Sequence, residues 1–160
     1  SFVVSAFRTY EQDPRYGLVV STEIGLKALS PGVNDPGTAI QVLAMQEQVL
    51  AIWARRQLEE LPEVQYPHVY VQGLVSADLF EDAFSGMAHY GAGDFSVMLR
   101  LQKTLLALFN QGDATFREAA REQSALALKR SSIGFDWSLM TSFRAARLAA
   151  YWATRRSRFF

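Results

Sequence analysis

The chain has 160 residues and no cysteine, and its 16 Lys and Arg residues balance its 16 Asp and Glu residues. This length and a composition that is 49% hydrophobic and 20% charged are typical of a globular protein, so we expect residues 1–160 to form a single domain. The lack of cysteine excludes disulfides, thiolate metal sites and cysteine nucleophiles.

The sequence offers no candidate for a membrane-spanning helix. Its longest stretch without a charged residue, 64–77, contains Pro67 and Gly73 and is shorter than the roughly 20 apolar residues that a span needs. We therefore expect a soluble domain. Because the chain starts at Ser1, without Met and without a leader sequence, we also expect it to be part of a longer protein.

The charges are divided unevenly along the chain. Residues 1–128 contain nine Lys and Arg against fifteen Asp and Glu, a net charge of −6, whereas residues 129–160 contain seven against one, a net charge of +6. A basic tail of this kind can contact an anionic partner such as lipid headgroups or nucleic acid, or can pack on the acidic part of the same chain.

The first predicted element is a strand. Residues 1–9 are apolar, favour β structure and lack a helix cap, and residues 68–72 alternate Val69 and Val71 with polar or aromatic neighbours. These two segments predict one small two-stranded β element. The alternative is that residues 1–9 complete a sheet whose other strands belong to the rest of a longer protein.

A helical hairpin follows the first strand. Asp13 before Pro14 is a cap followed by a first-turn proline, which predicts a helix over 14–29, and apolar residues on several of its faces predict that it is buried on most sides. Proline and glycine in the stretch 30–32 end this helix. Asp35 is the predicted cap of a second helix over 36–58, and the short joint between the two helices predicts a hairpin.

The second helix has a polar face and an apolar face. Gln41, Gln48 and Arg55 are seven residues apart and predict the side toward water. The predicted inward residues are Ile40, Leu43, Val49, Leu50 and Trp53.

Four further helices are expected after the hairpin. Ser76 is the predicted cap of a helix over 76–90, whose inward stripe is Phe80, Ala83, Phe84 and Met87. Asp94 is the predicted cap of the next, and the remaining helices span 95–110, 115–129 and 137–155, with a loop at 131–135. The predicted fold class is therefore mainly α, with about six helices around a central helical hairpin and one small two-stranded β element.

Two strings of residues resemble a known family. RTYEQDPRYG at 8–17 and ALSPGVNDPGTA at 28–39, followed by DAF at 82–84 and RLQK at 100–103, are similar to a bacterial family of predicted integral membrane proteins of unknown function. The resemblance implies transmembrane helices and a small β-rich segment before this helical region. It implies no reaction.

The joint is the densest group of polar and turn-forming residues. Ser30, Asn34, Asp35 and Thr38 meet where the second helix begins, and free amide groups at a helix start favour a bound anion or polar group. Arg8 and Asp13 could brace this corner through a charge-assisted hydrogen bond. The structural interpretation, which we favour, is that these residues serve the tight turn and the helix caps.

Other chemical motifs are weak. His68 and His89 are far apart in sequence, and the two-glycine turn at 91–93 lacks the third glycine of a dinucleotide loop. Glu23 and Glu47 are single acids without a visible catalytic mate. We expect no metal and no cofactor, and we regard an enzyme as the less supported class.

The last predicted helix combines basic and aromatic residues. Arg144, Arg147, Arg155, Arg158 and Trp152 suit a helix lying in a membrane interface, where arginines meet phosphates and rings lie at headgroup level. A docked terminal helix with a solvated basic side is the simpler interpretation. Nucleic acid is the least favoured partner, because the rest of the chain is acidic and carries no recognition motif.

From these observations we expect a non-enzymatic, membrane-associated domain on the cytoplasmic side. Its expected role is to assemble or regulate a membrane-embedded region. The expected partners are the protein's own transmembrane region, the membrane surface and, in a homo-oligomer, a second copy. The alternative is a domain that binds a small molecule or an anion, including an enzyme, through the SPGVNDPGT loop.

Overall fold

The structure, a computed structural model, describes residues 13–59, 68 and 73–131. Within these ranges it is mainly helical, with five continuous helices and no strand. The third helix is continuous but contains a π-helical segment, so it is labelled in three parts: α3 (Ser76–Phe80), η1 (Glu81–Ser85) and α4 (Gly86–Tyr90). The other four helices are α1 (Pro14–Ala28), α2 (Pro36–Glu59), α5 (Phe95–Phe109) and α6 (Ala114–Ser131).

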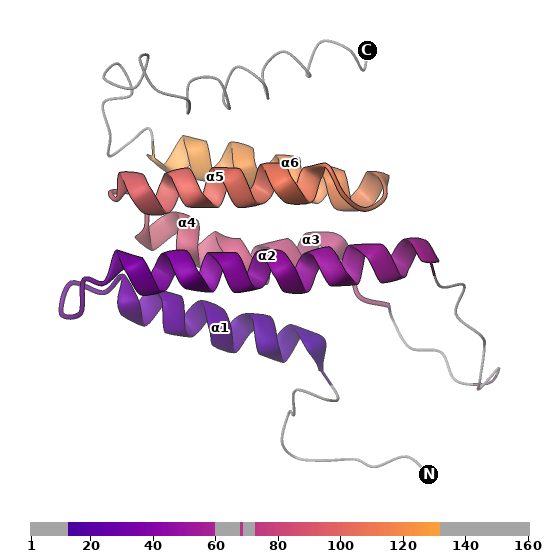
Figure 1. Ribbon diagram of the computed structural model, residues 1–160, viewed down its shortest axis with the longest axis horizontal. Coiled ribbons are helices and arrows are strands. Elements are labelled where there is room, and N and C mark those ends of the chain that lie inside the picture. The colour runs from indigo at the N-terminus through magenta and orange to yellow at the C-terminus, as the bar shows by residue number, and fades with distance from the viewer. Residues whose placement is uncertain (1–12, 60–67, 69–72, 132–160) are drawn as a thin grey trace.

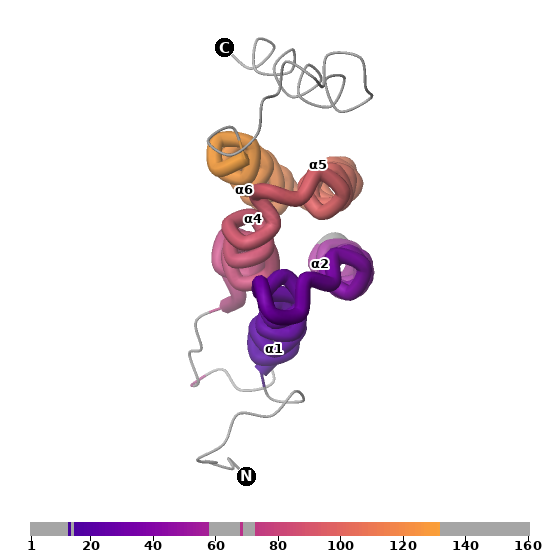
Figure 2. The backbone as a smooth tube through the Cα atoms, turned by 90° about the vertical axis from the view of Figure 1, so that its left-hand side faces the viewer, coloured from indigo at the N-terminus to yellow at the C-terminus, as the bar shows by residue number. Residues whose placement is uncertain are grey.

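The helices form two layers. Figure 2 shows α1, the third helix and α6 following one another in one layer, with α2 and α5 beside them in the second. Consecutive helices run in opposite directions, so α2 and α5 are parallel neighbours (Figure 1). The short joints between α1 and α2 and between α4 and α5 lie at the same end of the bundle.

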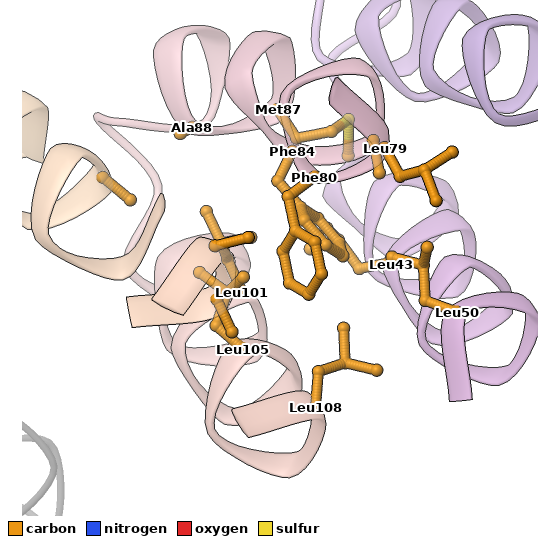
Figure 3. Packing of buried hydrophobic residues seen from close by; sticks show 14 of the residues in the cluster. Leu43, Leu50, Leu79, Phe80, Phe84, Met87, Ala88, Leu101, Leu105 and Leu108 are labelled. Carbon is orange, nitrogen blue, oxygen red and sulfur yellow. The ribbon is translucent and has the colours of Figure 1, made fainter. Parts of the chain in front are cut away.

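The third helix supplies the centre of the core. It packs against both α1 and α6, and its buried residues point between the layers (Figure 3). The ring of Phe80 lies 4.8 Å from that of Phe116 on α6 in an edge-on contact and 5.6 Å from that of Phe84. The members of this buried stripe, each at most 2% exposed, are Leu79, Phe80, Ala83, Phe84, Met87 and Ala88.

The predicted hairpin is present, but it is not central. α1 and α2 pack along each other, yet α1 lies at the edge of its layer, and the third helix occupies the middle (Figure 2). The prediction that α1 is buried on most sides was wrong, because Ile24 is 54% exposed. A 3.6-residue repeat of small and apolar residues gives α1 one buried face instead. That face consists of Leu18, Thr22, Gly25 and Ala28.

Most details of α2 and the third helix agree with the sequence. The predicted polar side of α2 is exposed and the predicted stripe of the third helix is fully buried. Val49 was wrongly placed inside, since it is 52% exposed while its neighbour Leu50 is 1% exposed. Apolar character alone cannot separate two adjacent positions that differ by about 100° around a helix.

Aspartate side chains cap four of the five described helices, namely α1, α2, α5 and α6. The Asp13 carboxylate accepts the amide protons of Arg15 and Tyr16, and the Asp94 carboxylate accepts that of Val97, as predicted. Asp113 does the same for α6.

The predicted cap at Ser76 was wrong. Ser76 is the first residue of α3, and Val75 occupies the cap position without a side-chain hydrogen bond. Ser76 itself is buried, so tertiary packing has displaced the capping role that its hydroxyl favours in isolation.

Several sequence predictions lie outside the described residues. These are the strand at 1–9, nearly all of the strand at 68–72, and the helix at 137–155. His68 is described and lies in a turn, and Ser131, assigned to a loop, is the last residue of α6. The six-helix count and the β element are thus not supported by the part of the chain that the structure describes.

Candidate functional site

The joint between α1 and α2 is closed mainly by backbone hydrogen bonds. The Ser30 carbonyl accepts from the amides of Val33 and Asn34 at 3.0 and 2.8 Å, and the Asp35 amide donates to the carbonyl of Ala28 at 2.8 Å. The Ser30 hydroxyl donates to the carbonyl of Lys27 at 2.7 Å, within its own helix end. The side chain of Ser30 therefore satisfies one of the carbonyls left free at the end of α1.

Asp35 and Thr38 interact with each other. One carboxylate oxygen of Asp35 accepts the Thr38 amide proton at 3.1 Å, and the other accepts the Thr38 hydroxyl proton at 2.6 Å. The hydroxyl bond first, and then the backbone bond, lower the pKa of Asp35 below its ordinary value. The pair caps α2 and places a negative charge where an anion would otherwise bind.

The left-handed residue of the joint is Asn34 rather than a glycine. Asn34 has φ of 46°, a conformation that asparagine tolerates better than other residues with a side chain, and it is exposed. Gly32 does not have positive φ, and a Cβ atom built on it would meet nothing within 4 Å. The turn therefore depends on Asn34, and the glycine that first suggested it is not sterically required.

The other predicted site residues do not gather at this joint. Asp13 caps α1 at the opposite end of that helix. Arg8 and the tail residues Arg144, Arg147, Arg155, Arg158 and Trp152 lie outside the described residues. Of the candidate set, the structure thus brings together Ser30, Asn34, Asp35 and Thr38.

A polar cluster that sequence reasoning missed joins α1 to the third helix. The Arg15 guanidinium binds Asp82 through two hydrogen bonds, Nε to Oδ2 at 2.6 Å and Nη2 to Oδ1 at 3.2 Å, and reaches Asp78 at 3.1 Å. The hydrogen bonding that Arg15 donates to the Asp82 carboxylate is the main cause that raises the pKa of Arg15. Both Arg15 and Asp82 belong to the strings that carried the family resemblance, and this was the available signal.

The π-helical turn is held by side chains of its two neighbours. The Thr22 hydroxyl on α1 lies 2.8 Å from the carbonyl oxygen of Asp82 and 3.2 Å from that of Ala83. On the other side, Arg130 of α6 donates to the carbonyl of Ser85 at 3.0 Å. A π turn disturbs the regular hydrogen-bond ladder, so these contacts help to satisfy its backbone and fix its place between α1 and α6.

Glu47 also has a structural task. Its carboxylate accepts hydrogen bonds from Arg100 and from the Thr104 hydroxyl on α5, both at 2.8 Å. The acid that the sequence left without a mate thus links α2 to α5. Among the described residues no group of three or more His, Cys, Asp or Glu side chains could hold a metal ion.

An exposed apolar surface lies on the outer side of the α1–α2 hairpin. We name it the hairpin patch and define it as Ile24 of α1 with Met45, Val49 and Ile52 of α2, which are 54, 57, 52 and 47% exposed. The three α2 residues follow a helical spacing of four and three, so they form one stripe. None of the helices that the structure describes is long and apolar enough to cross a bilayer.

Comparison with known proteins gives a family but no reaction. The family described as "Predicted membrane protein (DUF2254)" matches residues 1–107. Uncharacterised proteins of Mycobacterium bovis and Mycobacterium tuberculosis are 47% identical over 53 residues. That match covers 33% of this chain and only 10% of each relative's length. No solved structure matches. With two thirds of its length matched, the chain belongs to this family of predicted membrane proteins.

Proposed function

We propose that this chain is a non-enzymatic helical domain that assembles or regulates the membrane-embedded region of a longer protein. Two facts support this role. The family is described as a predicted membrane protein, and the match to the mycobacterial relatives takes up a tenth of their length, which leaves room for other regions. The basic residues of 129–160 suit the cytoplasmic leaflet, whose anionic lipids attract Lys and Arg.

The observation that carries the proposal is the hairpin patch. Contiguous apolar side chains on an exposed surface are typical of contact sites. By contrast, two pairs of charged groups of the kind that catalysis uses are engaged between helices: Arg15 with Asp82, and Glu47 with Arg100. A domain with this distribution acts by contact more readily than by catalysis.

The alternative, a ligand site at the joint, has less support. Asp35 and Thr38 bond to each other, and the Ser30 hydroxyl bonds to its own helix. The exposed carboxylate of Asp35 also opposes an anionic ligand. The tail residues named above stay a separate proposal for a membrane-interface helix.

The assembly role can be tested in the full-length protein. Phe84→Asp places a charge at a position with no exposed area and should unfold the domain, whereas Leu126→Gln changes an exposed residue of α6 and should not. Light scattering of the detergent-solubilised protein measures its oligomeric size, and melting of the membrane-embedded region measures its stability. We expect Phe84→Asp to change at least one of them. Wild-type values for both in this variant would contradict the proposed role.

A further inference from the structure

The residues of the hairpin patch come from two helices but lie on one surface of the hairpin. α1 and α2 are antiparallel, and they face each other at Ser21 and Gly25 on α1 and at Gln46 and Val42 on α2. Ile24 precedes Gly25, and Met45 precedes Gln46, each by one residue and hence by about 100° of helical rotation. When two right-handed helices are antiparallel, the residue one position before the shared contact lies on the same side of the pair in both helices. Ile24 and Met45 therefore lie on one surface.

This surface is the outer one. Arg15 and Thr22 mark the opposite side of α1, where the third helix packs, and Glu47 marks the side of α2 that packs on α5. Figure 2 shows nothing of the described chain beyond the hairpin on its outer side. The patch is thus left uncovered by the rest of the described bundle.

Both ends of the patch carry a positive charge. Arg56 continues the stripe of Met45, Val49 and Ile52 at the next helical position, about 16 Å from Met45 at the rise of an α-helix, and it is exposed. Lys27, also exposed, lies one turn beyond Ile24 toward the other end of the hairpin. Among the described side chains of α2 the sole acid is Glu47, and it is paired with Arg100 on the α5 side.

We propose that the hairpin patch rests on an anionic lipid surface, with its aliphatic side chains entering the interface and with Arg56 and Lys27 meeting lipid phosphates. Aliphatic residues between cations are the arrangement that such an interface favours. The patch contains no aromatic residue, whereas the energetic centres of protein–protein interfaces are rich in Trp and Tyr. Glu23, the exposed acid of α1, lies about 100° around that helix from Ile24, on the same side as Lys27, and is therefore outside the stripe of aliphatic side chains.

This inference rests on the proposed location at a membrane, and it can fail without the assembly role failing. The chain has no cysteine, so Met45→Cys and the control Leu126→Cys each provide one labelling site, at 57% and 46% exposed positions on α2 and α6. Both carry an environment-sensitive NBD fluorophore on the 160-residue chain. Residues 129–160 are unchanged in both, so binding by the basic tail alone affects them alike.

The probe is a phosphatidylcholine vesicle with or without one quarter phosphatidylglycerol. We expect anionic vesicles to shift the emission at position 45 to the blue and to leave that at position 126 unchanged. Flotation with anionic vesicles should weaken about fivefold in Arg56→Gln and stay unchanged in the matched control Arg117→Gln, an exposed arginine of α6. Circular dichroism verifies that each variant is folded.

Three results would overturn the proposal. The first is an equal response, or none, at positions 45 and 126. The second is an equal shift with neutral and anionic vesicles. The third is a concentration-dependent shift at position 45 without any vesicle, which would assign the patch to a second copy of the chain. If any of these occurs while Phe84→Asp still changes the oligomeric size or the melting of the full-length protein, the lipid contact is refuted and the assembly role is not.

Discussion

The contact between Arg15 and Asp82 gives a quantitative test of how α1 is held to the third helix. The perturbation is a double-mutant cycle of Arg15→Met and Asp82→Asn, with a second cycle of Arg15→Met and Asp78→Asn as an internal comparison. Arg15→Met keeps most of the aliphatic stem and removes the charge. The two cycles share one arginine, so they compare two carboxylates bound by the same group.

The structure predicts different coupling energies for the two carboxylates. Exposed ion pairs contribute about 0.2–1 kcal/mol, and hydrogen bonds to charged groups in protected positions contribute about 1.5–3 kcal/mol. The side chains of Arg15 and Asp82 are 35% and 18% exposed and share two hydrogen bonds, so the pair falls between these classes, at about 1–2 kcal/mol. Asp78 is 46% exposed and makes one bond, which predicts roughly 0.5 kcal/mol or less.

Urea unfolding followed by circular dichroism measures both couplings, provided that the slope of each transition is unchanged among the variants. The cycle with Asp82 should also weaken less in 1 M salt than the cycle with Asp78, because screening acts more strongly on exposed charges. A coupling with Asp82 below about 0.5 kcal/mol, or no larger than that with Asp78, would refute the assignment.

Three further predictions use neighbouring or matched positions. Gly91→Ala should destabilise the protein by about 1–3 kcal/mol, because a Cβ atom would lie 2.6 Å from an α5 side chain and 2.7 Å from a backbone oxygen. Gly32→Ala should change stability by less than about 0.5 kcal/mol, because a Cβ atom there meets nothing within 4 Å. On α2, Leu50→Ala should cost about 2–5 kcal/mol, while Val49→Gln should stay within about 0.5 kcal/mol of the wild type. The pKa of Asp113 is lowered from 3.8, mainly by a backbone hydrogen bond at the start of α6. The ionised carboxylate therefore stabilises the folded protein above pH 3.8, and this stabilisation is lost as the pH falls through the lowered pKa. Asp113→Asn should therefore flatten the fall of stability with pH in the acid range.

Urea unfolding at neutral pH measures the first two pairs, and unfolding between about pH 2 and 5 measures the third, in the range where carboxylates titrate. A loss at Gly32 as large as that at Gly91 would contradict the description of the joint. Equal effects at Leu50 and Val49 would contradict the orientation of α2. An unchanged acid slope in Asp113→Asn would remove that carboxylate from the helix cap.

The sequence predicted the described helices well because most of their starts and stops have a local chemical signal. Asp13 and Asp94 were identified from the preference of aspartate for helix starts, and both side chains make the predicted bonds. The buried stripe of the third helix was evident from its helical spacing. The misplacement of Ser76 shows the limit of such signals, because a buried hydroxyl is no longer available as a cap.

The arrangement of the helices was harder to predict. A hairpin is local, but the central position of the third helix depends on contacts with α1 and α6, which are distant in sequence. The same distance hid the pair of Arg15 and Asp82, which are 67 residues apart. The π turn left no periodicity signal, since one added residue in a helical repeat is indistinguishable from ordinary variation.

For the candidate site, the sequence placed four polar residues at the joint (Ser30, Asn34, Asp35 and Thr38), but residue type does not reveal what each polar atom bonds to. Ser30 bonds backward to α1, and Asp35 bonds forward to Thr38, so the cluster is divided between two helix ends. The hairpin patch was missed because Val49 was assigned to the core. Recognising it required knowledge of which side of α2 the other helices cover.

We propose that this domain acts through contact of the hairpin patch with the membrane. The most direct measurement is labelling by a water-soluble maleimide in the full-length protein, made cysteine-free apart from Met45→Cys or the control Leu126→Cys, in opened native membranes. We expect slow labelling at position 45 and rapid labelling at position 126, with both rapid in the isolated chain without membranes. Equally rapid labelling of both positions in the membranes would contradict this proposal.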